Sequence, residues 1–300
     1  MPVTITVPEK VSAGFVVATN RVVHDLPTMI RQNLPAQFTE PVLERLGTTR
    51  LQIAEYQASD SPWDLSRTTA VDEEDSKQAR EATRHVGVLS ELETTDLPSG
   101  LHLARTAAEA LAESLCGIPV DLSTDRVLPG LYFEDSGNFI LADDWIGASL
   151  PPYRNGGECQ VGTGDIDGCT CVRISTRGLC RFGLPELEIA DVACAHDLAA
   201  LNVLRTTAQH LLPLGRHPGS HLLPMELRLT SDDFAAFWGS REQLWEGDPV
   251  PVRLVEAGPL RLGIEAPDDF PGTMNEWLWD EIPPVMHELL SSEPDDPGPT

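Results

Sequence analysis

Four cysteines near the middle of the chain are the residues whose type is best suited to hold a metal ion. Cys159, Cys169, Cys171 and Cys180 could supply the four thiolates of a tetrahedral zinc site. Structural zinc sites usually pair cysteines about two to four residues apart in tight turns, whereas here a Cys-x-Cys pair is flanked by single cysteines ten and nine residues away. The spacing favours free thiols, and a zinc site or a redox-active pair at Cys169 and Cys171 are the alternatives.

Other polar clusters give weaker indications of chemistry. Asp165 and Asp167 before Gly168 resemble part of a calcium loop, but the glutamate that closes such a loop is missing, so a solvated turn is the better interpretation. His217 and His221 are four residues apart, but the proline and glycine between them exclude the helical histidine pair of a zinc protease. The sequence contains no GxSxG, GxGxxG or P-loop motif. We therefore expect no cofactor and find no recognisable catalytic signature.

Tryptophans and acidic residues are interleaved in the last quarter of the chain. The residues expected at a partner-binding surface there are Trp245, Glu246, Glu276, Trp277, Trp279 and Asp280. Aromatic rings supply apolar contact area and carboxylates attract basic groups, which is how an acidic inhibitor or adaptor would hold a cationic partner. The alternative is that these tryptophans fill the core beneath the C-terminal elements.

The charge balance of the chain is strongly acidic. Its 300 residues include 47 acidic and 21 basic side chains, which gives a formal net charge of −26. Such a field repels nucleic acids and anionic membrane surfaces, so a basic protein is the favoured partner, although a genome-wide compositional bias would produce the same charge. No segment resembles a secretory leader or a membrane span, and six cysteines are too dilute for a disulfide scaffold. We expect a cytoplasmic protein with reduced thiols.

Two strand-helix-strand units are the elements expected to position these residues. The first consists of a strand at His85–Leu92, a helix at Leu101–Cys116 capped by Ser99, and an extended segment at Gly117–Leu122. The second consists of a strand at Glu186–Val192, a helix at Asp197–Leu212, and a strand at Met225–Thr230. Both helices repeat apolar residues at steps of three and four, which indicates one face packed on a sheet.

The remaining segments complete an α+β pattern with mixed, largely antiparallel sheets and packed helices. Further strands are predicted at Ala13–Thr19, Arg50–Tyr56, Asn138–Trp145, Thr170–Ser175, Pro251–Val255 and Leu260–Ile264. Further helices are predicted at Asn20–Leu34, interrupted near Pro27, at Asp232–Trp238, and at Asn275–Leu290, broken at Pro283 and Pro284. Asp72–Lys77 is predicted to be a charged connection and Asn155–Gly168 a loop. We divide the chain into an N-terminal α/β lobe (1–128), a C-terminal α+β lobe (129–290) and a disordered tail (291–300).

The most distinctive stretch is Ser175–Ile189, STRGLCRFGLPELEI, in which Thr-x-Gly is followed by Phe-Gly-x-Pro-Glu-Leu-Glu. It resembles the signature of a bacterial domain family of unknown function and is more distantly similar to the suppressor-of-fused-like class, whose bacterial members are often associated with immunity proteins or binding partners. The resemblance covers roughly residues 85–230 and implies no catalytic residues. Its signature positions are Thr176, Gly178, Phe182, Gly183, Pro185, Glu186 and Glu188. The glycines would permit tight turns, the proline would fix the entry to a strand, and the phenylalanine would anchor the turn in the core.

Two classes of function follow from these observations. The favoured one is a non-enzymatic acidic protein-binding module, such as an immunity-type or regulatory inhibitor of a basic partner. The alternative is an enzyme with a metal- or thiol-dependent site built from scattered Cys, His, Asp and Glu residues. The first predicts a salt-sensitive complex with a cationic protein, and the second predicts stoichiometric metal or a ligand in a polar pocket.

Overall fold

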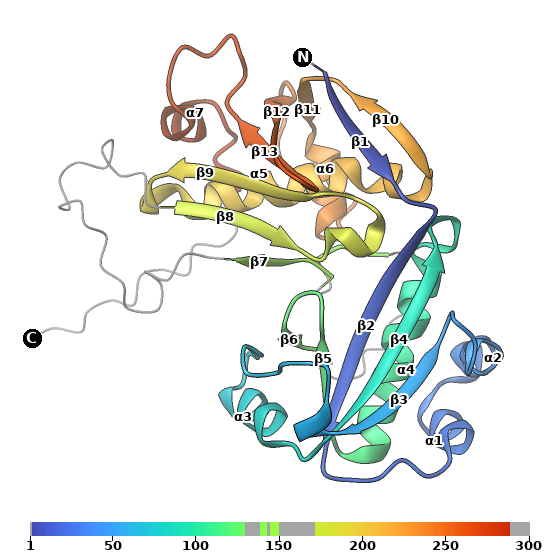
Figure 1. Cartoon of the computed structure of the whole chain (residues 1–300). Helices are drawn as coiled ribbons and strands as arrows, with labels where there is room; N and C mark the ends of the chain where they lie inside the picture. The colour runs from blue at the N-terminus through green and yellow to red at the C-terminus, as the bar shows by residue number, and fades with distance from the viewer. Residues whose placement is uncertain (1, 130–138, 143–144, 150–171, 289–300) are drawn as a thin grey trace, which may run out of the picture.

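Two sheets, each with a long helix on one face, organise the residues that the computed structural model describes, namely 2–129, 139–142, 145–149 and 172–288 (Figure 1). The first sheet is antiparallel, in the order β3 (Gln52–Gln57), β4 (Arg84–Glu93), β2 (Lys10–Thr19), β5 (Ile118–Asp121) and β6 (Arg126–Val127). The second has the order β11 (Glu226–Leu229), β12 (Val250–Gly258), β13 (Arg261–Glu265), β9 (Glu186–Val192), β8 (Val172–Arg177) and β7 (Gly147–Ser149). Its β13 and β9 are parallel, and its other neighbours are antiparallel. The predicted α+β fold with mixed, largely antiparallel sheets is confirmed.

Both predicted strand-helix-strand units form. Helix α4 (Ser99–Leu115) joins β4 to β5, which run parallel because both pair antiparallel with β2 between them. Helix α5 (Asp197–Leu211) joins β9 to β11, which are also parallel, with β12 and β13 between them. Each unit is therefore a crossover that skips at least one strand and places its helix against the sheet.

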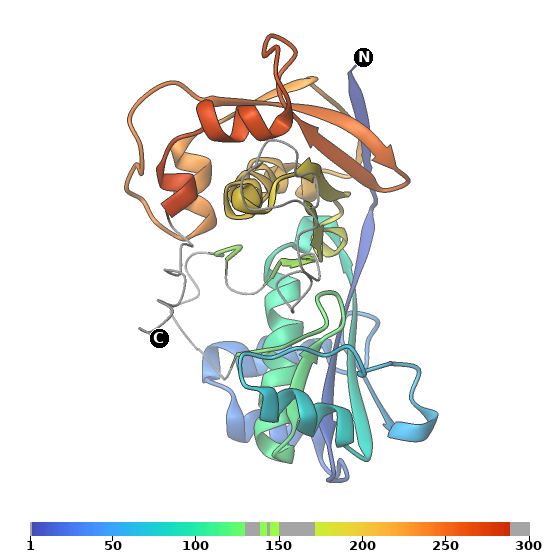
Figure 2. The ribbon, with the colours of Figure 1, turned by 90° about the vertical axis from the view of Figure 1, so that its left-hand side faces the viewer.

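Helices cover both faces of the first sheet (Figure 2). Side chains alternate between the faces along β2, so Phe15 and Val17 face the main core with α4, whereas Val16 and Ala18 belong to a smaller apolar cluster that includes Ala79. Ala79 lies on α3 (Glu73–Glu81), and α1 (Leu26–Asn33) and α2 (Ala36–Arg45) pack on α4.

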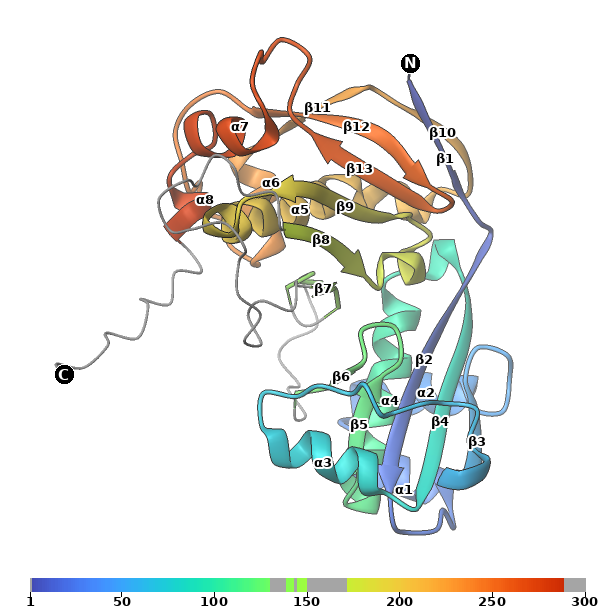
Figure 3. The same cartoon turned by 60° about the vertical axis from the view of Figure 1, so that its left-hand side comes forward.

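Helix α5 is the central helix of the second half (Figure 3). It packs on β8 and β9, with α6 (Ser231–Phe237) and α8 (Val285–Glu288) against it, while α7 (Met274–Asp280) contacts β9. One hydrophobic cluster runs from Val3 near the N-terminus to Met286 of α8 and includes α4 and α5, so the two sheets share a core.

The N-terminal strand β1 (Val3–Val7) links the two halves. It pairs antiparallel with β10 (Gly219–Leu223) beside the second sheet, and the chain then enters β2 at the centre of the first sheet (Figure 1). Its alternating sequence VTITV buries Val3, Ile5 and Val7. A strand more than two hundred residues away in sequence completes this ribbon.

Several local predictions are wrong. Residues Asp72–Lys77 are not a connection, because Glu73–Glu81 is helix α3, with the Asp72 side chain accepting a hydrogen bond from the Glu74 N–H. Ser99 does not cap α4, since Pro98 is the N-cap and makes no side-chain hydrogen bond. The described part of Asn138–Trp145 contains no strand. The predicted loop at Asn155–Gly168 and the tail 291–300 lie outside the described residues. In the parts of the chain that the structure covers, no helix has both the length and the apolar composition needed to cross a membrane.

Candidate functional site

The signature segment forms a tight turn between β8 and β9 that is organised by one carboxylate. Glu186 accepts hydrogen bonds from the Thr176 hydroxyl at 2.7 Å, from the Gly178 N–H at 2.9 Å and from the Cys180 N–H at 3.2 Å. Gly178 and Gly183 have φ values of 104° and 75°, in the left-handed region that favours glycine. These signature residues therefore have a structural explanation, as the sequence predicts for the glycines.

A buried ion pair fastens this turn to the first sheet. Arg181, in the single 3₁₀ turn of the signature, lies 2.8 Å (Nη1 to Oδ2) and 3.0 Å (Nη2 to Oδ1) from Asp121 of β5, and both side chains are 1% exposed. The Ser123 N–H donates to the same carboxylate at 2.8 Å. Because burying two charges is costly unless they pair closely, this close ion pair fixes how the turn sits on β5.

Two arginines contact the ring of Trp145 at the same junction. The guanidinium carbons of Arg105 and Arg181 lie 4.8 Å and 5.9 Å from its ring centroid, within cation–π range. Arg105 also donates to Glu109 at 3.0 Å, one helical turn along α4. Burial raises the pKa of the Glu109 carboxyl above its usual value, and Arg105 opposes this shift. The junction between the halves is thus aromatic and charged as well as apolar.

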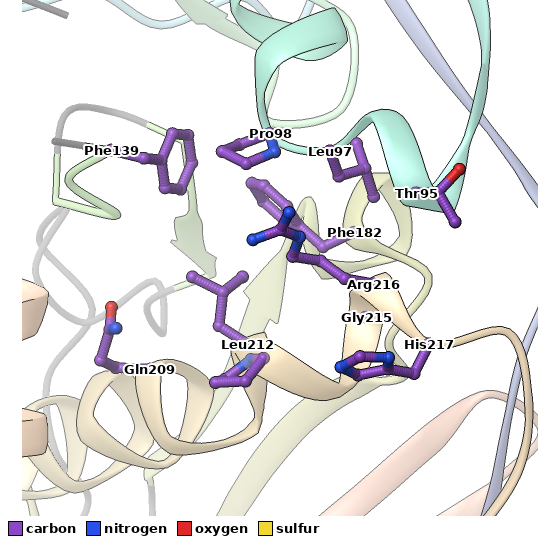
Figure 4. Close-up of a pocket in the computed structure, with 11 residues that line it drawn as sticks. Thr95, Leu97, Pro98, Phe139, Phe182, Gln209, Leu212, Gly215, Arg216 and His217 are labelled. Atoms are coloured by element: carbon purple, nitrogen blue, oxygen red, sulfur yellow. The ribbon is translucent and has the colours of Figure 1, made fainter. Parts of the chain in front are cut away.

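A cavity of about 640 Å³ opens beside this junction (Figure 4). Its described lining comes from the segment before α4, from Phe139, from the signature turn, and from the end of α5 with the 3₁₀ segment Leu212–Arg216 that follows it. The lining residues are Thr95, Leu97, Pro98, Phe139, Phe182, Gln209, Leu212, Pro213, Gly215, Arg216 and His217. Gly215 is required at one wall, since a Cβ there would lie 2.1 Å from the Phe182 carbonyl oxygen.

A second groove, of about 720 Å³, lies on the second sheet and is polar. Its arginines are already paired: Arg173 lies 3.9 Å from Glu188, and Arg253 forms ion pairs with Glu265 and Asp268. Glu188, the last signature residue, also pairs with Arg261 at 2.8 Å. Asp191 and Glu256 also line the groove, so its described lining is acidic overall, while both of its arginines are already paired.

The metal and thiol predictions receive no support from the described residues. Cys159, Cys169 and Cys171, like Asp165 and Asp167, lie outside them. Cys180 is exposed, but desolvation and the nearby Glu186 carboxylate raise the pKa of its thiol, which makes it a poorer nucleophile at neutral pH. Within the covered ranges no group of three or more His, Cys, Asp and Glu residues could hold a metal ion.

The structure separates the tryptophans that the sequence places on one surface. Trp277 is 1% exposed and lies in the core, so its assignment to a partner-binding surface is wrong. Trp245 is half-buried and packs edge-on against Phe234 of α6, with Glu246 exposed beside it in the chain. Trp279 is 65% exposed and belongs to α7.

Trp279 is held in place by two histidines. The buried His196, at the start of α5, stacks on its indole at a centroid distance of 5.3 Å and an interplanar angle of 23°. His287 of α8 contacts it edge-on at 5.9 Å, and burial lowers the pKa of this imidazole, so it is mainly neutral at pH 7. The ring contacts with His196 and His287 therefore hold the indole in place while most of its area remains accessible.

Acidic residues surround Trp279 in sequence and on α7. The chain after Arg261 contains no lysine or arginine but ten acidic residues, which are Glu265, Asp268, Asp269, Glu276, Asp280, Glu281, Glu288, Glu293, Asp295 and Asp296. Glu276 and Asp280 are exposed on α7. Glu276 also has a local role, since it forms a capping box with Thr273, and those hydrogen bonds lower the pKa of its carboxyl.

Comparison of the chain with known protein families, curated proteins and solved structures finds no match. The resemblance of the signature segment to a bacterial family therefore stays a prediction. The Trp279 surface and the junction cavity are the two features of the described residues whose geometry suits a ligand. Sequence reasoning missed the cavity residue Arg216, because no periodicity or motif marks it and its neighbours in space come from three distant segments.

Proposed function

We propose that this protein is a non-enzymatic, cytoplasmic binding protein that holds a basic protein partner on the acidic surface around Trp279. The observation that carries the proposal is an indole that is 65% exposed yet supported by stacking on buried His196. An aromatic side chain that is already fixed loses little conformational entropy when a partner covers it. Fixed, accessible tryptophans are typical anchors of protein interfaces.

The charge of the surface indicates the chemistry of the partner. Asp280 adjoins Trp279, Glu276 lies one turn earlier on α7, and the chain beyond Arg261 carries no lysine or arginine. An arginine or lysine that stacks on the indole would meet these carboxylates as well, so cation–π attraction and ion pairing act together. An inhibitor or immunity-type role, as the resemblance implies, would use such a surface to cover a cationic site on its partner.

The test compares an uncharged change with a matched control. Trp279→Ala leaves the net charge unaltered, so it removes the anchor but not the general attraction of an acidic protein for cations. We expect it to weaken binding of a tryptophan-free, arginine- and leucine-rich peptide about tenfold in calorimetry, equivalent to about 1.4 kcal/mol. Leu222→Ala, at a side chain that is 70% exposed on β10, is expected to bind like the wild type.

A second set of variants tests the carboxylates. Replacing Glu246, Glu276 and Asp280 together by Gln, Gln and Asn is expected to weaken binding and reduce its salt dependence. Glutamine at position 276 retains the capping box, so the melting temperature should change little. If Trp279→Ala and Leu222→Ala bind the peptide equally well, the indole is no anchor and the proposal fails.

A further inference from the structure

The junction cavity has the form of a small-molecule site. Its floor is apolar and buried, since Leu97 and Phe182 are 3% and 2% exposed and Gly215 allows the backbone to approach Phe182. A volume of about 640 Å³ is typical of ligand pockets, which are mostly apolar with a few polar groups that orient the ligand. In Figure 4 the Arg216 side chain extends across the cavity toward Phe182 and Pro98.

Arg216 supplies the charge of the cavity. Among the described residues, no hydrogen bond or ion pair engages its guanidinium. None of the described lining residues is acidic, although the chain has 47 acidic residues. Asp96, between two lining residues, is held by Arg45 through contacts of 2.5 and 3.0 Å. The described lining of the cavity therefore carries a positive charge in a protein that is negative overall.

The helix ends beside the cavity add little net charge, so the positive charge of the described lining comes from Arg216. The N-terminus of α4 and the C-terminus of α5 both adjoin it. Their macrodipoles present partial charges of opposite sign, about half an elementary charge each, which largely offset one another. Gln209 and His217 add side chains that can form hydrogen bonds elsewhere in the lining.

We propose that the cavity binds a small molecule with an apolar body and one carboxylate, and that Arg216 pairs with that carboxylate. The planar guanidinium presents two parallel N–H groups that match the two oxygens of a carboxylate. A phosphate dianion fits less well, because a single arginine would leave half of its charge unpaired. The apolar body occupies the space bounded by Leu97, Phe182 and Leu212, where its surface is removed from water.

The experiment titrates matched probes into the full-length protein by calorimetry. 1-Naphthylacetate and decanoate carry the proposed chemistry with an aromatic and an aliphatic body, and 1-naphthylethanol and decanol are their uncharged counterparts. At least one carboxylate is expected to bind tenfold or more tightly than its alcohol. Arg216→Gln should reduce carboxylate binding at least tenfold and leave alcohol binding unchanged, as expected for loss of a charge-assisted pair.

Two further variants assign the effect to this cavity. Arg50→Gln removes the same charge at an exposed arginine whose side chain has no partner among the described residues, and it should bind the probes like the wild type. Leu212→Trp should abolish binding of both members of a pair by filling the cavity, with its fold checked by circular dichroism. Absence of binding by both carboxylates at millimolar concentration, equal affinity for carboxylate and alcohol, or unchanged binding in Arg216→Gln would each overturn the proposal.

Discussion

Replacing Asp121 by asparagine tests whether the Arg181 pair joins the two halves. The two side chains make contacts of 2.8 and 3.0 Å and are 1% exposed. Asparagine keeps the shape and the oxygen that accepts from the Ser123 N–H, but it leaves the guanidinium buried without an anion. Breaking a buried pair from one side costs about 3–5 kcal/mol, which is a large part of a typical stability of about 5–15 kcal/mol.

The assay is urea unfolding at pH 7, with a double-mutant cycle. Asp121→Asn is expected to lose about 3–5 kcal/mol, and Asp121→Asn with Arg181→Met is expected to lose less than the sum of the single changes, because no buried charge then remains. Glu91→Gln is the control, since its pair with Lys10 is half-exposed and worth at most about 1 kcal/mol. A loss below about 1 kcal/mol for Asp121→Asn would refute the reasoning.

Three other changes have expected outcomes. Gly215→Ala should destabilise the protein by more than about 2 kcal/mol in urea unfolding, because its Cβ would meet a backbone carbonyl oxygen at 2.1 Å. Gly47→Ala is the comparison: Gly47 has a φ of 79° and no atom near the position of an added Cβ, so the change should cost about 1 kcal/mol. Glu186→Gln should cost about 1–3 kcal/mol in the same assay, because the amide cannot accept all three hydrogen bonds. The hydrogen bond to Asp233 raises the pKa of His210 above its usual 6.5. That pair should therefore stabilise the protein at pH 6 and lose its effect as the pH rises through the raised pKa, as a comparison with His210→Gln across pH would measure.

Much of the fold follows from local patterns, and the errors have physical causes. The apolar stripes of α4 and α5 and the apolar runs of β2 and β4 are strong enough to be found from sequence, because each element buries one face or both. Helix α3 has no comparable stripe. Its signals are instead Asp72 at the N-cap and acidic residues in the first turn. Judged by composition alone, such a segment resembles a charged connection.

Pairing between distant segments is what the sequence could not supply. The alternation of Val3–Val7 is visible, but its partner Gly219–Leu223 is far away in the chain, and no local rule selects it. The cavity has the same origin, because Leu97, Phe182 and Arg216 meet only after both crossover units have formed. A site built from four separate segments leaves no spacing to recognise.

The two tryptophans of α7 show how a correct element can give a wrong surface. Trp277 and Trp279 are two residues apart on a helix, which separates their directions by about 200°. The two side chains therefore lie on different faces of the helix: Trp277 is buried in the core, and Trp279 is exposed. The sequence predicts an acidic surface with both tryptophans here. In the structure, Trp279 is the one tryptophan of α7 that lies on that surface.

The two proposed sites need ligands of opposite charge, and the range of electrostatic forces explains how one chain carries both. At physiological ionic strength the screening length is about 8 Å, so a ligand responds mainly to charges near it and not to the formal total of −26. Around Trp279 those charges are the carboxylates of α7. In the cavity the nearby charge is Arg216, since Arg45 neutralises Asp96. The net charge thus governs which macromolecules approach, whereas a few local residues decide the sign of what each site binds.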